Sequence, residues 1–338
     1  MKKSKIILFL FIFPIYIFGQ EFTLKSGVNF FFDNTEFAGS SYTLDQTMAG
    51  VHLAPEIGLK WDKSNSLYGG VNMLKQLGSI KTIDNVRLLA YYQFKDKNTF
   101  FRAGAFEKED LFNDYSNFFF QDSVRYYRPI IEGLFLKKGN DRRYFKLWLD
   151  WTGLQSDTIR ESFFLGASAY HAFARSFFTS FQSYVFHYAG TRPSHPNQHV
   201  CENILAQISL GYKYSGKDWN NVTVSGGVLA GFERNRQFMD DTYIPVGFVA
   251  QADAEYKRWG VQNLLYAGQP RMKLYNEFGH NLYWGNPFLR GNLYFQNKIY
   301  LKVFDTKYVT GELASRQSFS EGKLYFEQLF LLSASLSK

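Results

Sequence analysis

The stretch MAGVHLAPEIGLKWDKSNSLYGGVNMLKQ, residues 48–76, decides the fold. Apolar side chains occupy every second position from Ala49 to Trp61, with mostly small or polar residues between them. A period of two places one face of a strand in an apolar phase and the other face in water. The polar residues 62–66 then reverse the chain, and a similar alternation continues to Gln76. The stretch therefore predicts an antiparallel β-hairpin that is apolar on one side.

The same alternation recurs along the rest of the chain, which predicts about 16 strands, with a range of 14 to 18. An even number is usual for single-chain outer-membrane barrels. Outside the hairpin, the expected strands cover residues 22–32, 84–95, 99–106, 125–137, 145–152, 160–172, 177–188, 203–214, 222–234, 245–257, 261–268, 293–304, 308–316 and 324–336.

The connections between these strands alternate in length. Short polar turns are expected at residues 62–66, 95–98, 138–142, 173–176, 215–220, 257–260 and 305–307. The breaks between them are often long, at residues 33–47, 107–124, 189–202, 235–244 and 269–292. Short periplasmic turns and long extracellular loops are typical of outer-membrane barrels.

Aromatic residues, which make up 19% of the chain, flank most of the short turns. Rings at one depth on successive strands would form a girdle at the membrane boundary. The expected girdle pairs are Trp61 and Tyr68, Phe94 and Phe100, Phe135 and Tyr144, Phe173 and Phe177, Tyr214 and Trp219, Tyr256 and Trp259, and Phe304 and Tyr308.

Residues 1–19 have the pattern of a secretory signal peptide. Three lysines precede an apolar run from Ile6 to Phe18, which is too short for a spanning helix of about 20 residues. No later run approaches that length, so strands must carry any membrane insertion, and strands survive in lipid only as a closed barrel. We expect an all-β protein whose residues 20–338 form one antiparallel transmembrane barrel.

The signal peptide, the alternating strands, the alternating loop lengths and the girdle together resemble bacterial outer-membrane β-barrels of the general porin kind. The resemblance covers the mature chain and concerns its architecture. It implies a place in the outer membrane of a Gram-negative bacterium, after removal of the signal peptide. It also implies contact with outer-membrane lipid and lipopolysaccharide, and it allows a homo-oligomer or a partner outer-membrane protein.

Charged and polar side chains on the inner face of the expected strands are candidates for lining a pore, where charges of both signs would tune ion selectivity. They are His52, Glu56, Lys60, Arg87, Lys146, Asp150, Lys213, Glu233, Asp253 and Glu255. About 16 strands leave room for water, although a plugged lumen stays open as an alternative.

Two long breaks are rich in aromatic residues. By analogy with porins, residues 107–124 are the best candidate for a segment that folds inward and narrows the lumen; the alternative is an external cap. Residues 269–292 combine rings with amides and carboxylates, which suits either contact with sugars or a loop with its own small core. The candidates for ligand contact in the two breaks are Tyr115, Phe119, Tyr275, Tyr283 and Trp284.

The sequence predicts a channel for small hydrophilic solutes, with saccharides as one candidate, and no enzyme. It contains no Gly-x-Ser-x-Gly elbow and no phosphate-binding glycine loop, so no catalytic or cofactor-binding residue is expected. No metal site is expected either, since Pro196 interrupts the group His195, His199 and Cys201. No nucleic-acid partner is expected, because the net charge of +8 is spread along the chain. The alternatives are a non-conducting barrel whose loops bind a protein, glycan or lipopolysaccharide, and, more remotely, an outer-membrane hydrolase.

Overall fold

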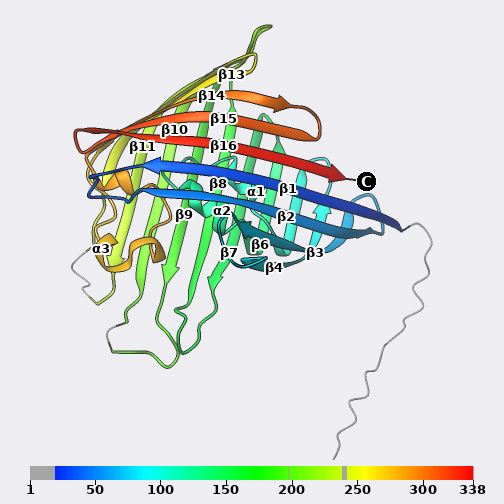
Figure 1. Cartoon of the computed structure of the whole chain (residues 1–338), viewed down its shortest axis with the longest axis horizontal. Coiled ribbons are helices and arrows are strands. Elements are labelled where there is room, and N and C mark those ends of the chain that lie inside the picture. The colour runs from blue at the N-terminus through cyan, green and yellow to red at the C-terminus, as the bar shows by residue number, and fades with distance from the viewer. Residues whose placement is uncertain (1–19, 197, 238–241, 338) are drawn as a thin grey trace, which may run out of the picture.

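The computed structural model describes residues 20–196, 198–237 and 242–337. Sixteen antiparallel strands close into one barrel, in which β1 pairs with both β2 and β16 (Figure 1). The expected fold class is confirmed. The predicted signal peptide lies outside the described residues.

The first half of the barrel holds eight strands. They are β1 (Glu21–Glu36), β2 (Gln46–Lys60), β3 (Asn65–Gln76), β4 (Asn85–Lys95), β5 (Thr99–Glu107), β6 (Ile130–Asn140), β7 (Arg143–Gly153) and β8 (Ser162–Ala172). The second half continues with β9 (Phe177–Tyr188), β10 (Cys201–Tyr214), β11 (Trp219–Asn235), β12 (Val246–Tyr256), β13 (Trp259–Gly268), β14 (Leu293–Asp305), β15 (Val309–Ser320) and β16 (Lys323–Ser337).

The short helices lie in the two longest breaks. They are α1 (Glu109–Phe112), α2 (Asp122–Tyr127), α3 (Tyr275–Phe278), η1 (Gly279–Asn281) and η2 (Pro287–Arg290). Within the described residues, no helix is long and apolar enough to cross a bilayer.

The hairpin at residues 48–76 forms as predicted. In β2 the side chains of His52 and Glu56 are buried on the inner face, whereas Leu53 and Ile57 are exposed on the outer face. A strand that separates lipid from a polar lumen needs this alternation.

One predicted strand begins too early. Residues 125–129 were expected to open the strand 125–137, but residues 122–127 form α2 and β6 begins at Ile130. Pro129 disfavours helix at the residue before it, so the helix ends there. Val124 and Tyr126, which resemble alternating strand residues, are instead the buried residues of α2.

The aromatic girdle is confirmed for part of the predicted set. Rings near the short turns are exposed on the outer wall, namely Trp61, Phe173, Phe177, Tyr214, Trp219, Tyr256, Trp259, Phe304 and Tyr308. Tyr68 and Phe135 are wrong as girdle residues, because both are buried in the hydrophobic core inside the barrel. Tyr144 is also wrong, since its hydroxyl donates to Asp114 of the segment inside the lumen, 3.1 Å away. Proximity to a turn does not reveal which face of the strand a ring occupies.

Candidate functional site

Two segments fold into the barrel and fill its centre. We call residues 108–129 the first inner segment and residues 269–292 the second inner segment. Their apolar side chains join one hydrophobic core with inward residues from thirteen of the strands, from β3 to β14 and from β16. A smaller cluster joins α2 to β1, β2 and β3. The inward folding expected for residues 107–124 is confirmed, and the second inner segment joins the same core.

The first inner segment is fixed to the barrel wall by polar contacts. The Tyr115 hydroxyl donates to the backbone carbonyls of Ala167 and Ser183, at 2.9 and 3.0 Å, and accepts a hydrogen bond from Trp148 Nε1 at 2.9 Å. The Lys108 ammonium lies 2.6 Å from Asp150 Oδ2, and both residues are buried. The segment therefore has a defined position.

The second inner segment is held by Glu233 of β11, which is 1% exposed. Its carboxylate accepts hydrogen bonds from the backbone N–H groups of Met272 and Lys273, at 2.8 and 2.7 Å. It also accepts one from the Tyr283 hydroxyl at 2.8 Å. Burial and the Glu233 charge raise the pKa of Tyr283, which keeps this hydroxyl protonated as a donor.

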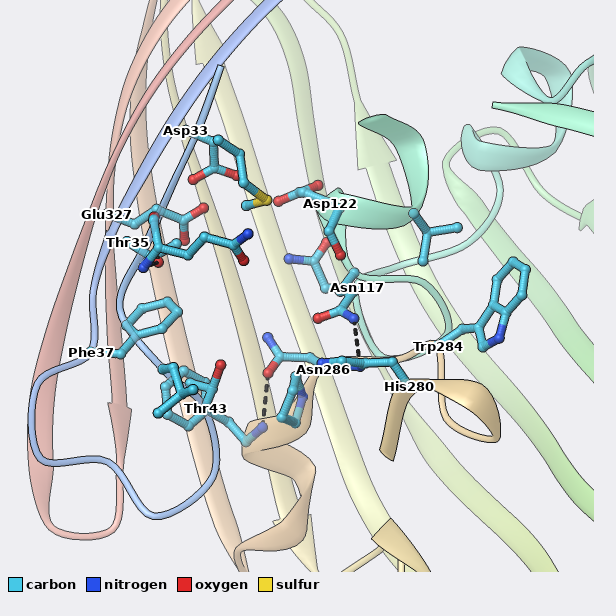
Figure 2. Close-up of a pocket in the computed structure, with 18 of the residues that line it drawn as sticks. Asp33, Thr35, Phe37, Thr43, Asn117, Asp122, His280, Trp284, Asn286 and Glu327 are labelled. Atoms are coloured by element: carbon cyan, nitrogen blue, oxygen red, sulfur yellow. Dashed lines mark hydrogen bonds between the residues drawn. The ribbon is translucent and has the colours of Figure 1, made fainter. Parts of the chain in front are cut away.

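A pocket of about 350 Å³ lies between the two inner segments, the wall formed by β1 and β14–β16, and the loop after β1 (Figure 2). It is on the side of the long loops, because residues 35–46 and 280–287 contribute to its lining. Most of the residues that line it are polar. Among them are Thr35, Gln46, Asn117, Gln121, Arg128, Asn281, Asn286 and Ser318.

Three carboxylates meet in this pocket, brought together by the closure of the barrel. Asp33 comes from β1, Glu327 from the paired strand β16, and Asp122 from the first turn of α2. One oxygen from each lies within 4.8 Å of the others. Asp33 and Glu327 are almost fully buried, at 1% and 4% exposure.

Arg316 of β15 forms ion pairs with two members of this cluster. Its Nη1 lies 2.7 Å from Asp122 Oδ2 and 2.6 Å from Glu327 Oε1. Burial disfavours ionisation of Asp122, but Arg316, Arg125 and Lys298 together hold its pKa below the usual value. The cluster is thus built around an ionised Asp122.

The cluster has the donors that a hard divalent cation takes. Ca²⁺ and Mg²⁺ bind carboxylate oxygens, and three such oxygens converge here. Asp33 Oδ1 is buried and has no hydrogen-bond partner among the described residues. Because Arg316 bonds the other two residues, a cation would share Asp122 and Glu327 with it. These residues therefore fit a cation site that is partly neutralised by an arginine.

His280 is the one histidine among the described residues that line the pocket. It lies at the rim, with Nδ1 3.0 Å from Gln121 Nε2 and Nε2 3.0 Å from the Tyr275 hydroxyl. Partial burial lowers the pKa of His280 below the usual value, so the ring is neutral at pH 7. A neutral imidazole beside a polar pocket can accept a proton.

The model of the family described as lipid A 3'-O-deacylase-type matches residues 19–333, nearly the whole chain. The chain belongs to this family. No curated protein matches the sequence.

The fold is similar to solved outer-membrane barrels. OpdK from Pseudomonas aeruginosa gives a TM-score of 0.54 at 10% identity, covering 94% of this chain and 99% of that one. The loop L8 deletion mutant of OmpT from Vibrio cholerae gives 0.56 at 10% identity, covering 94% and 100%. Pseudomonas aeruginosa OccK9 (OpdG) gives 0.53 at 11% identity, covering 94% and 99%. At this identity the likeness concerns the fold, and the predicted porin-like architecture is confirmed.

Most of the predicted pore-lining residues of this family member contact the inner segments or neighbouring wall residues. His52 lies 2.9 Å from Asn72 Oδ1 and 2.7 Å from the Tyr126 carbonyl of α2. Arg87 donates to the Tyr127 carbonyl. Asp150 and Glu233 hold the two inner segments as described above. Lys146 lies 2.8 Å from Asp114 Oδ2.

The remaining candidates lie nearer the short turns. Glu56 accepts a hydrogen bond from the Tyr91 hydroxyl at 2.6 Å, and Lys60 lies 3.7 Å from Glu21. Asp253 accepts a hydrogen bond from the Gln251 amide, and Glu255 Oε1 lies 2.7 Å from Lys302 Nζ. Lys213 is exposed. That any of the ten lines a conducting path stays a prediction.

Four of the five predicted ligand-contact residues are buried in the core. Tyr115, Phe119, Tyr283 and Trp284 are each no more than 5% exposed, and Tyr275 is half-buried beside His280. The buried rings of the second inner segment belong to the shared core inside the barrel, so the segment does not form a small core of its own. Direct contact of these rings with a sugar stays a prediction.

The sequence interpretation did not group Asp33, Asp122 and Glu327, which it placed in a loop, in a second loop and in the last strand. The signal that could have found two of them is alternation. Asp33 continues the inward positions of β1, after Phe31, and Glu327 lies between the inward Tyr325 and Leu329 of β16. No pattern in the sequence predicts that α2 brings Asp122 next to Asp33 and Glu327.

Proposed function

We propose that the protein is an outer-membrane hydrolase that removes an ester-linked acyl chain from a lipid A-type glycolipid, with the acidic pocket as its active site. The observation that carries the proposal is the convergence of Asp33, Asp122 and Glu327 in a polar pocket on the long-loop side of a barrel with a packed centre. The family's description and the expected extracellular position of that side support it. The sequence analysis named a hydrolase as the more remote alternative, and the acidic pocket is the site that we propose for it.

Hydrolysis of an ester adds water to the carbonyl carbon and breaks the bond to the alkoxy oxygen, giving a fatty acid and a sugar hydroxyl. A divalent cation at the three carboxylates would polarise the carbonyl and lower the pKa of a bound water. His280 is the candidate general base, since its neutral ring can take the proton that water loses. Asn117, Gln121 and Asn286 offer amides for the hydroxyls of a glycan head group.

The test is acyl release by the refolded mature protein. The protein is mixed with lipid A in detergent micelles containing Ca²⁺ or Mg²⁺, and mass spectrometry follows the loss of an acyl chain from the lipid. We expect release by the wild type, loss of release with a chelator, and a decrease of at least about 100-fold in Asp33→Asn and Glu327→Gln, because each replaces a carboxyl group that would coordinate the cation. Asp253→Asn is the matched control, as Asp253 is an inward carboxylate that does not line the pocket.

Full activity in both pocket variants would remove the acidic pocket as the site. No acyl release by a folded wild type, judged by heat-modifiable mobility, would count against the hydrolase itself.

A channel for small hydrophilic solutes is the second candidate. It is favoured by the barrel's likeness to outer-membrane proteins such as OpdK and by charges of both signs on the inner wall. A channel would give stable conductance steps for the wild type in a planar bilayer. We expect no such steps, because the core spans the lumen.

A further inference from the structure

A second cavity of about 250 Å³ lies on the short-turn side of the first inner segment. Its walls are the inner faces of β7–β12, and residues 113–116 close it on the side of the core. Tyr144, Tyr170 and Phe178 place it near the short turns, since each lies within three residues of a strand end at those turns. It is thus separate from the acidic pocket, which lies among the long loops.

Most side chains around this cavity are neutral hydroxyls and amides. They are Asn113, Ser116, Ser168, Ser180, Gln182, Gln207, Ser209, Thr223, Ser225 and Gln251. The one charged residue of the described lining is Asp114, which is neutralised by Lys146 at 2.8 Å and bonded by the hydroxyls of Tyr144 and Ser168, at 3.1 and 2.5 Å. The cavity therefore presents hydrogen-bonding groups without a dominant charge.

Three polar atoms of the lining are buried without a hydrogen-bond partner among the described residues. They are Gln182 Oε1, Gln207 Oε1 and Ser116 Oγ. Gln182 and Gln207 are directly opposite each other in the β9–β10 register, so their amides are neighbours on one wall. Buried polar groups are normally bonded, so two adjacent carbonyl acceptors indicate a ligand that brings O–H or N–H donors.

An aromatic surface completes the cavity. Tyr144 and Tyr170 are stacked with ring centroids 5.7 Å apart, and Tyr170 is stacked with Phe178 at 5.2 Å. All three rings line the cavity. Ring faces suit the C–H faces of a sugar, while nearby amides and hydroxyls bond its hydroxyl groups.

We propose that this cavity binds a small neutral polyhydroxylated ligand, such as a single sugar ring, entering from the short-turn side. The stacked rings would cover one face of the ligand, and Gln182 and Gln207 would accept hydrogen bonds from its hydroxyls. The absence of an unneutralised charge among the described lining residues favours a neutral sugar over a sugar acid. The site is independent of the proposed hydrolase activity, because it shares no lining residue with the acidic pocket.

The test is isothermal titration calorimetry of the full-length mature protein in an amine-oxide detergent, which avoids sugar-based detergents. The probes are glucose and gluconate. We expect saturable binding of glucose, with gluconate at least 10-fold weaker. The double variant Gln182→Leu/Gln207→Leu should weaken glucose binding at least 10-fold, and so should Tyr170→Leu.

Gln262→Leu is the matched control, as this inward glutamine of the neighbouring strand β13 does not line the cavity; its glucose affinity should equal that of the wild type. All variants are first checked for heat-modifiable mobility. No binding of glucose by the folded wild type would overturn the proposal. Equal affinities in the wild type and in a folded Tyr170→Leu or double variant would also overturn it, as would equal affinities for glucose and gluconate.

Discussion

Glu233 illustrates how a single buried residue of the barrel wall can position the second inner segment. Its carboxylate accepts two backbone N–H groups and one tyrosine hydroxyl of the second inner segment. It also lies 3.8 Å from Arg271 Nη2. The sequence placed Glu233 on the inner face as a candidate for lining a pore, a role that stays a prediction. Its contacts with the second inner segment could not be predicted, because alternation reveals the face of a strand and not what lies against it.

Replacing Glu233 by alanine should release the second inner segment. The two backbone N–H groups and the Tyr283 hydroxyl would be buried without an acceptor. Each unsatisfied donor lowers stability by about 1–3 kcal/mol, so we expect the free energy of local opening to decrease by about 4 kcal/mol. Amide hydrogen exchange of Met272 and Lys273 measures this. Glu233→Gln is the control, since it keeps one acceptor oxygen and should lose less than half as much. Unchanged protection in Glu233→Ala would contradict the assigned anchoring role.

His280 makes the proposed hydrolysis depend on pH. Partial burial lowers its pKa below the usual 6.5, so the neutral base is present at pH 7 and is lost as the pH falls through that lowered value. The rate of acyl release should therefore be flat above about pH 7 and decrease on the acid side, with a midpoint below 6.5. His280→Gln should reduce kcat about 100-fold or more and flatten this acid limb. An unchanged kcat and acid limb in the variant would assign the base elsewhere.

At the scale of elements, the strands and the inward folding of residues 107–124 could be predicted, but the helices and wall contacts of the inner segments could not. Because lipid covers one side of every strand, apolar and polar side chains alternate with a period of two, and this period can be recognised in the sequence. The inner segments are governed by contacts with distant strands, such as Lys108 with Asp150 and Tyr115 with Ala167. These contacts leave no period, which explains why α2 resembled the start of β6.

The buried pair Lys108–Asp150 should be a main anchor of the first inner segment. Burial lowers the pKa of Lys108, whereas the ion pair with Asp150 opposes that shift. Asp150→Asn would leave the ammonium unpaired in the interior, which costs about 3–5 kcal/mol. We expect increased proteolysis between residues 108 and 129 and a lower urea midpoint. The double variant Lys108→Met/Asp150→Leu should recover part of the stability; a double variant as unstable as the single one would show that the charge pair is not the cause.

At the scale of the whole molecule, a hydrophobic core inside the barrel separates the acidic pocket from the second cavity. Deleting residues 112–120 would remove Tyr115 and Phe118–Phe120 from that core and join the pocket to the cavity. We therefore expect the wild type to give no stable steps in a planar bilayer and the deletion variant to give open steps, since about 16 strands leave room for water once the interior is vacated. Heat-modifiable electrophoretic mobility is the control that checks whether the deletion variant still forms a barrel. The Asp150→Asn variant should behave between the two. It should give brief channel openings, because its first inner segment is held less firmly. Equal steady conductance in the wild type and the deletion variant would mean that the core does not seal the lumen, and it would favour the channel over the hydrolase.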